Sequence, residues 1–150
     1  PETERPRFQV HPGLSALQLA AARAGAPLMH DFCTISLSDR LTPWDVIERR
    51  IEAAASGDFV VAIYNPRSRD RNWQLTRAKE ILLCARPETT PVVMARQLGR
   101  SDEHVSLHSL GNLRPEDVDM LTVLVIGNSS SRVQDGRMVT PRGYPGATLN

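Results

Sequence analysis

The spacing of hydrophobic residues near the start of the chain predicts a short strand followed by a helix. Residues 8–10 have the character of a strand end, and Ser15 can then cap a helix that ends at Gly25. The apolar positions at helical spacing are Leu17, Ala20, Ala21 and Ala24. One strand and one helix are a small unit to bury alone, so we expect this piece to belong to a larger neighbouring sheet.

The next segment has the pattern of a strand followed by an amphipathic helix. Residues 34–38 alternate as in a strand, with Ile35 and Leu37 on one face. Thr42 is expected to cap a helix whose first residue is Pro43, and Gly57 is expected to end it. The core-facing stripe of that helix is Trp44, Ile47, Ile51, Ala54 and Ala55.

A second strand and helix enclose a loop that is rich in arginine. Residues 59–64 form an apolar run that breaks at Asn65-Pro66, and the helix that follows the loop ends before Pro87. The apolar face of this helix is Leu75, Ala78, Ile81, Leu82 and Ala85. A strand, a polar loop and a helix start is an arrangement in which α/β proteins hold small anionic or nucleotide-like ligands.

The rest of the chain predicts strands without a full helix between them. Residues 91–98 and 105–110 have strand patterns, residues 114–117 resemble a single helical turn, and residues 138–140 favour a short strand. Residues 121–126 are the most hydrophobic and are therefore expected at the centre of the sheet. The order predicts an α/β fold with a mixed sheet of about five strands flanked by helices.

Composition and charge exclude some classes of function. The chain has 150 residues with 41% hydrophobic and 23% charged residues, which is typical of a globular domain. No apolar run reaches the roughly 18 residues of a membrane span, and the start lacks the apolar core of a signal peptide, so we expect no membrane association and a cytoplasmic location. A net charge of +1 gives no whole-molecule field for nucleic acid.

Arginine and cysteine usage carry limited information. One lysine, Lys79, stands against many arginines, whose planar fork suits carboxylate or phosphate, although base composition of the coding genome explains such usage equally simply. Cys33 and Cys84 lie far apart without metal-binding spacing, and we interpret both as buried thiols.

Several polar clusters are candidates for a ligand site, each with a plain structural alternative. Ser36, Ser38, Asp39 and Arg40 stand where a strand meets a helix and serve either as helix caps or as a ligand-facing loop. Arg67, Arg69 and Arg71 form either a solvated loop or an anion site. Asn128 follows the central strand, a position favoured for ligands at the carboxyl ends of parallel strands.

The histidines and known motifs add little. His30-Asp31 favours a structural role over an acid–base pair, and His104 and His108 lie on a predicted strand where they form no chelating pair, so no metal is expected. No glycine-rich nucleotide loop, nucleophile elbow or zinc spacing is present, which weighs against a self-contained nucleotide enzyme.

Residues 30–75, HDFCTISLSDRLTPWDVIERRIEAAASGDFVVAIYNPRSRDRNWQL, closely resemble the precorrin-3B C17-methyltransferase group of the tetrapyrrole methylases. The stretches HPGLSAL, VDMLTVLVIGNSSSR and GRMVTPRGY extend the resemblance over nearly the whole chain. It implies S-adenosylmethionine-dependent methyl transfer, with ring contraction, onto a corrinoid precursor in cobalamin biosynthesis. It also implies two-domain α/β homodimers that hold both ligands between the domains.

The resemblance also implies a domain organisation. The family's glycine-rich loops of the amino-terminal domain are absent, so the chain is similar to a carboxyl-terminal portion. Residues 1–30 would end the first domain and residues 31–150 would form the second. We therefore expect the chain to need the missing amino-terminal domain and not to turn over alone.

Site residues carry over from the family by position. The residues implied to contact the cofactor are Ser15, Ala16, Tyr64, Asn65, Gln97 and Leu98. Our own hypothesis for the carboxylates of the substrate is a set made of Ser38, Asp39, Arg67, Arg69, Arg71 and Asn128, and no catalytic side chain is assigned. The alternative is a non-catalytic α/β module for anion or nucleotide binding or for dimerisation. A nucleic-acid interface is weaker, because no aromatic residues are interleaved with the arginines.

Overall fold

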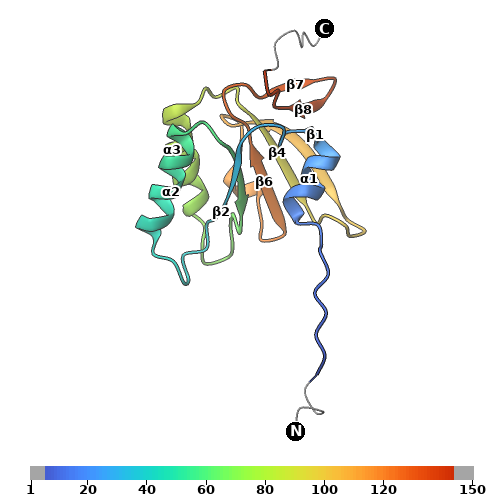
Figure 1. Ribbon diagram of the computed structural model, residues 1–150. Helices are drawn as coiled ribbons and strands as arrows, with labels where there is room; N and C mark the ends of the chain where they lie inside the picture. The colour runs from blue at the N-terminus through green and yellow to red at the C-terminus, as the bar shows by residue number, and fades with distance from the viewer. Residues whose placement is uncertain (1–5, 144–150) are drawn as a thin grey trace.

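A computed structural model describes residues 6–143 and shows two sheets with helices on both sides of the larger one (Figure 1). The larger sheet has the order β2-β3-β6-β4-β5, and the smaller has the order β1-β8-β7. The helices are α1 (Ala16–Ala24), α2 (Trp44–Ser56) and α3 (Gln74–Ala85), with a 3-10 turn at Pro115–Asp117. The strands are β1 (Gly25–Ala26), β2 (Phe32–Ser36), β3 (Val60–Tyr64), β4 (Pro91–Arg96), β5 (His104–Ser109), β6 (Thr122–Ile126), β7 (Arg132–Gln134) and β8 (Arg137–Val139).

The larger sheet is mixed and has β6 at its centre, as the sequence predicted. β2 and β3 are parallel, whereas β6 runs antiparallel to both of its neighbours, β3 and β4. The carboxyl ends of β2, β3 and β4 therefore meet at one edge, together with the start of β6. This edge is the lower one in Figure 1, and the loops after β2 and β3 leave from it.

Two apolar layers hold the helices against the larger sheet. On one face α2 and α3 pack through Ile47, Ile51 and Leu82 onto Ile63 and Leu124. On the other face α1 packs through Leu17, Ala20 and Ala24 onto alternate residues of the same strands. Because successive strand residues point to opposite faces, buried strands such as β3 supply both layers.

Helix α1 begins as predicted but lies in an unexpected place. Ser15 caps it in a capping box, and Gly25 ends it with a φ of 134°. We assigned this helix to a preceding domain, yet it packs on the sheet built by the following residues. The proposed boundary at residue 30 stays a prediction about the whole protein.

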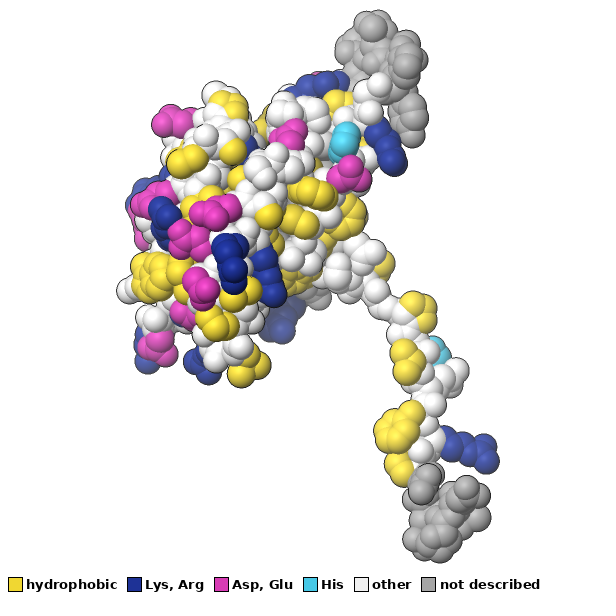
Figure 2. All heavy atoms as spheres, turned by 60° about the vertical axis from the view of Figure 1, so that its left-hand side comes forward, with side chains coloured by type: hydrophobic (Ala, Val, Ile, Leu, Met, Phe, Trp, Pro, Cys, Tyr) yellow, Lys and Arg dark blue, Asp and Glu magenta, His cyan; other side chains and the backbone are white. Residues whose placement is uncertain are grey.

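Several expectations from the sequence were wrong in detail. Residues 8–10 form no strand, because within residues 6–143 no strand pairs with them, and Phe8 and Val10 are 88% and 94% exposed. Figure 2 shows the segment before α1 extending away from the body of the molecule. Pro43, not Thr42, occupies the N-cap position of α2, because its backbone is extended with a ψ of 143°. Ala85 is exposed at the end of α3.

The smaller sheet was missed except for its last strand. β7 and β8 form a hairpin whose turn residues, Asp135 and Gly136, have φ values of 49° and 71°. Asp-Gly between two strands is a strong hairpin signal, and the sequence carried it. β8 also pairs in parallel with β1, which joins the end of α1 to the carboxyl-terminal part of the described chain.

A buried arginine that the sequence did not single out connects α2, the segment before β3 and the loop after β6. Arg86 is 5% exposed, and its guanidinium donates to the carbonyls of Ala54 (3.2 Å), Phe59 (2.6 Å) and Gly127. Burial lowers its pKa from the usual value, while the nearby Asp58 carboxylate acts in the opposite direction. Arg86 thus fixes the end of α2 and the loop after β6 at the edge opposite the strand ends described above.

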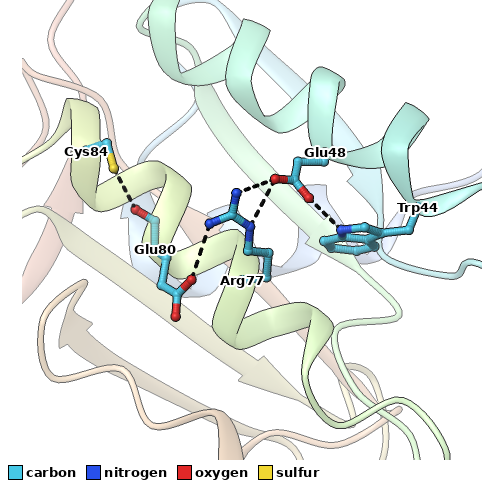
Figure 3. A network of polar contacts seen from close by, with 5 residues as sticks. All are labelled: Trp44, Glu48, Arg77, Glu80 and Cys84. Carbon is cyan, nitrogen blue, oxygen red and sulfur yellow. Dashed lines mark hydrogen bonds and ion pairs between the residues drawn. The ribbon is translucent and has the colours of Figure 1, made fainter.

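The outer side of α2 and α3 carries a network of polar contacts (Figure 3). Arg77 of α3 donates from Nε to Glu48 Oε1 of α2 (3.0 Å), and Trp44 Nε1 donates to Glu48 Oε2 (2.6 Å). The hydrogen bond from Arg77 is the main cause of the lowered pKa of Glu48. Cys84 is exposed on the same helix and donates to the Glu80 carbonyl, so its prediction as a buried thiol was wrong.

Candidate functional site

The strand-end hollow is a concavity at the edge where β3 and β4 end and β6 begins. It has a volume of about 210 Å³ and is lined by Ala16, Tyr64, Asn65, Gln97 and Leu98, and by residues 120–123 at the start of β6. Five of the six residues that the family resemblance places around the cofactor therefore lie together. They come from three separate stretches of sequence, and the parallel direction of β3 and β4 brings them to one place.

Tyr64 ties the end of β3 to the start of α1. Its hydroxyl oxygen accepts a hydrogen bond from the backbone N–H of Leu17 (2.9 Å), so one of the unpaired donors at the helix start is satisfied. The hydroxyl proton of Tyr64 stays available for another acceptor. Ser15, the sixth residue of the set, does not line the hollow; its hydroxyl accepts from Gln18 N (3.4 Å) and caps the helix.

Two lining residues of the strand-end hollow have an unusual backbone. Asn65 and Gln97 have φ values of 49° and 53°, a region that residues with side chains rarely occupy. Both stand directly after a strand. The side-chain amide of Asn65 donates from Nδ2 to the Ser36 hydroxyl (3.0 Å), and the backbone N–H of Gln97 donates to the Leu121 carbonyl (3.0 Å). Such outliers concentrate at ligand sites, where the surrounding structure holds them in place.

The arginine hollow lies beside the first and has a volume of about 530 Å³. It is lined by residues 67–69, Asn72 and residues 118–121, so it shares Met120 and Leu121 with the strand-end hollow. Arg67 donates to the Pro115 carbonyl (3.1 Å), and Arg69 is exposed. Asp119 is the acidic residue of the lining, and its Oδ2 pairs with Arg96 Nε (2.7 Å). Asp119 therefore does not neutralise Arg67 and Arg69. Glu116, outside this lining, lies near enough to Arg67 for the guanidinium to help lower the pKa of its carboxyl, which leaves exposed Arg69 as the freer of the two cations for an anion.

Arg71 differs from the other two arginines of its loop. It is 6% exposed, and its Nη1 donates to the Asn65 carbonyl (2.8 Å). The loop is thus not solvated throughout, and Arg71 does not line the arginine hollow. We restrict the proposed substrate contact to Arg67 and Arg69.

Ser38 and Asp39 lie near the same edge but line neither hollow. Asp39 Oδ2 accepts from Gln74 Nε2 (2.9 Å) and so connects the loop after β2 to the start of α3. Ser38 N donates to the Ser36 hydroxyl (3.2 Å). These bonds show the two residues organising the loop, and their contact with a substrate stays a prediction.

Asn128 lies at the wrong edge of the sheet for the proposed site. The rule that ligands bind at the carboxyl ends of strands holds for parallel strands, but β6 is antiparallel to β3, so Ile126 pairs with Val61 near the start of β3. Asn128 is 4% exposed, and its side-chain oxygen accepts from Ser130 and Ser131 within its own loop. Its proposed substrate contact is therefore withdrawn.

Met120, Leu121 and Arg100 also line the strand-end hollow, and no sequence pattern pointed to them. Met120 and Leu121 precede β6 and Arg100 follows β4, and the hydrophobic pattern of the sequence did not reveal that these two strands are antiparallel. The histidines lie outside both hollows: His30 contacts its neighbour Asp31 (3.7 Å), and His108 on β5 bonds to the Ser106 hydroxyl (2.8 Å). In the range 6–143, no helix is both long and apolar enough to cross a membrane.

Known proteins resemble this chain over most of its length. Residues 2–114 match the family model described as Tetrapyrrole (Corrin/Porphyrin) Methylases. The chain is 52% identical over 133 residues to a probable cobalt-factor III C(17)-methyltransferase of Salmonella typhimurium, covering 89% of this chain and 55% of that protein. It is 46% identical over 144 residues to a precorrin-3B C(17)-methyltransferase of Sinorhizobium sp, covering 93% of this chain and 57% of that one.

A solved structure shows the same fold. The crystal structure of the methyltransferase CobJ superposes with a TM-score of 0.82 at 43% identity, over 87% of this chain and 54% of that one. The α/β fold with a five-stranded mixed sheet is thereby confirmed. The chain spans about half the length of these relatives. From the family match and these identities, the chain belongs to the tetrapyrrole (corrin/porphyrin) methylases.

Proposed function

We propose that this chain forms part of an S-adenosylmethionine-dependent enzyme that methylates C17 of a corrinoid precursor, with ring contraction, in cobalamin biosynthesis. The observation that carries the proposal is the convergence of Ala16, Tyr64, Asn65, Gln97 and Leu98 on the strand-end hollow. The names of the relatives support the substrate class, since they are cobalt-factor III and precorrin-3B C(17)-methyltransferases.

The strand-end hollow fits one end of such a cofactor. Its volume of about 210 Å³ is below the roughly 300 Å³ of a complete ligand pocket, so it suits the adenosine part alone. The residues of the lining include aromatic Tyr64 and apolar Leu98 together with polar Asn65 and Gln97. Stacking or apolar contact together with a few fixed polar groups is the usual composition of a nucleoside site.

The chemistry needs positioning more than reactive side chains. The cofactor supplies a methyl group on a sulfonium, and a carbon nucleophile of the substrate has only to be held in line with it while water is excluded. In this proposal the strand-end hollow fixes the cofactor. Arg67 and Arg69 bind substrate carboxylates across the shared wall of Met120 and Leu121. Each charge-assisted hydrogen bond would contribute about 1.5–3 kcal/mol if dry and less if solvated.

The remaining expectations concern the whole protein. Residues 1–30 as the end of an amino-terminal domain, a homodimeric assembly and a cytoplasmic location rest on the family resemblance and remain predictions. The part of the relatives that this chain does not cover would complete the cofactor site.

The test joins this chain to the part of the Salmonella relative that it does not cover and measures methyl transfer to cobalt-factor III and to precorrin-3B. We expect labelled methyl to appear on one of these corrinoids in the joined protein. Replacing Arg67 and Arg69 together by glutamate should raise the KM for the corrinoid at least tenfold while the KM for the cofactor stays within about twofold. A joined protein that binds the cofactor but methylates neither corrinoid would favour the non-catalytic module.

A further inference from the structure

Arg71 is a buried cation whose hydrogen-bond partners are all uncharged. Its Nη1 donates to the Asn65 carbonyl (2.8 Å) and its Nη2 to the sulfur of Met120 (3.1 Å), and its Nε has no partner within residues 6–143. Burying a charge in this way costs free energy, and an apolar side chain of similar length would fill the same space without that cost. The position is therefore poorly explained by stability alone.

The two ends of the guanidinium reach the walls of both hollows. Asn65 lines the strand-end hollow, and Met120 lines both. The backbone of Arg71 is bonded in turn to Ser68, a lining residue of the arginine hollow: Arg71 N donates to the Ser68 hydroxyl (3.2 Å), and Ser68 N donates to the Arg71 carbonyl (3.0 Å). One residue thus holds a wall of each hollow and the partition between them.

The group that Arg71 holds on the cofactor side is under backbone strain. Asn65 has a φ of 49°, so its carbonyl keeps its direction only while its surroundings fix it. Arginine has a rigid fork that bonds two acceptors at once, whereas lysine is a single point charge. A shift of either partner therefore moves the guanidinium relative to the other.

We propose that Arg71 is a positioning residue that couples the two hollows, so that a ligand in one changes the affinity of the other for its ligand. The inference rests on the proposed function, because it takes the strand-end hollow as the cofactor site and the arginine hollow as the site of a polycarboxylate. Arg71 contacts neither ligand. Its effect passes through Asn65 on one side and through Met120 and Ser68 on the other.

The experiment uses the nitrogen-15-labelled chain joined to the part of its Salmonella relative that it does not cover. This protein is titrated by NMR with S-adenosylhomocysteine and with an octacarboxylate porphyrin, each alone and in the presence of the other. In the wild type we expect the first ligand to change the Kd of the second about fivefold or more, by the same factor in either order. In Arg71→Lys this factor should fall to about one. The control Arg69→Gln should weaken porphyrin binding alone and keep the coupling.

A further variant separates loss of coupling from loss of folding. Met120→Leu keeps the volume of a half-exposed side chain and removes only the sulfur acceptor, so it should fold normally and lose part of the coupling. Wild-type coupling in folded Arg71→Lys would overturn the inference, and if that variant does not fold, wild-type coupling in Met120→Leu would do so. A wild type that binds both probes without coupling overturns the inference alone. A wild type that binds neither probe overturns the proposed function as well.

Discussion

The hydrogen bond between Tyr64 and Leu17 gives a sharp prediction, because it joins the proposed cofactor site to the start of α1. Replacing Tyr64 by Phe removes one oxygen and keeps the ring that packs against the core of α1. The backbone N–H of Leu17 then loses its acceptor. A buried donor left unpaired costs about 1–3 kcal/mol, and because this contact is only partly buried, we expect about 1 kcal/mol.

The loss is measurable by unfolding and by amide exchange. For a chain of this size, about 1 kcal/mol corresponds to a fall in Tm of about 2–4 °C. The exchange of the Leu17 amide should accelerate, while amides of the central strand β6 should change only by the global loss of stability. Ser15→Ala is the matched control, since it removes the acceptor of Gln18 N at the same helix start and should cost about 1 kcal/mol. An unchanged Leu17 exchange rate and Tm in Tyr64→Phe would mean that this hydrogen bond does not stabilise the start of α1.

Two further variants test other parts of the structure. Gly25→Ala should lower the free energy of unfolding by about 2–4 kcal/mol, because the φ of Gly25 is 134° and a Cβ there would lie 2.6 Å from the Met138 carbonyl oxygen. Gly99→Ala is the control: Gly99 has a φ of 74° but open space around it, so the loss should be only about 1 kcal/mol. Equal losses of the two variants in denaturant unfolding would contradict this expectation. Burial raises the pKa of Asp119, but hydrogen bonds from Arg96, Thr122 and Leu121 outweigh this effect and lower the pKa below its usual 3.8. The stability that the ionised Asp119 contributes is therefore fully present above pH 3.8, and it is lost as the pH falls through the pKa of the folded protein. The Tm difference between wild type and Asp119→Asn should therefore be constant down to about pH 5 and shrink in stronger acid, and a difference that grows there would contradict the sign.

The elements of the fold were largely predictable because their signals are local. The cap at Ser15, the helix end at Gly57 and the apolar faces of α2 and α3 follow from spacing within a few residues. The central position of β6 followed from its hydrophobicity, and all five of its residues are buried. These features depend on short-range pattern and on burial, both of which a single sequence carries.

The errors at the site arose where the direction of a strand or the burial of a charge decided the outcome. Asn128 was assigned to the site because β6 was not known to be antiparallel to β3, which sends its carboxyl end to the opposite edge. Arg71 looked like its neighbours Arg67 and Arg69, and only the fold shows that the Asn65 carbonyl and Met120 surround it. The direction of β6 and the burial of Arg71 both depend on contacts between residues far apart in the sequence, and a local pattern does not reveal such contacts.

The proposed cofactor site is tested by locating the bound cofactor. The measurement is a crystal structure of the wild-type chain, joined to the part of its Salmonella relative that it does not cover, with S-adenosylhomocysteine bound. The proposed cofactor site requires the adenosine to lie in the strand-end hollow, in contact with Tyr64, Gln97 and Leu98, with the sulfur on the side of Met120. An adenosine bound at the opposite edge beside Asn128, or anywhere outside the strand-end hollow, would contradict it.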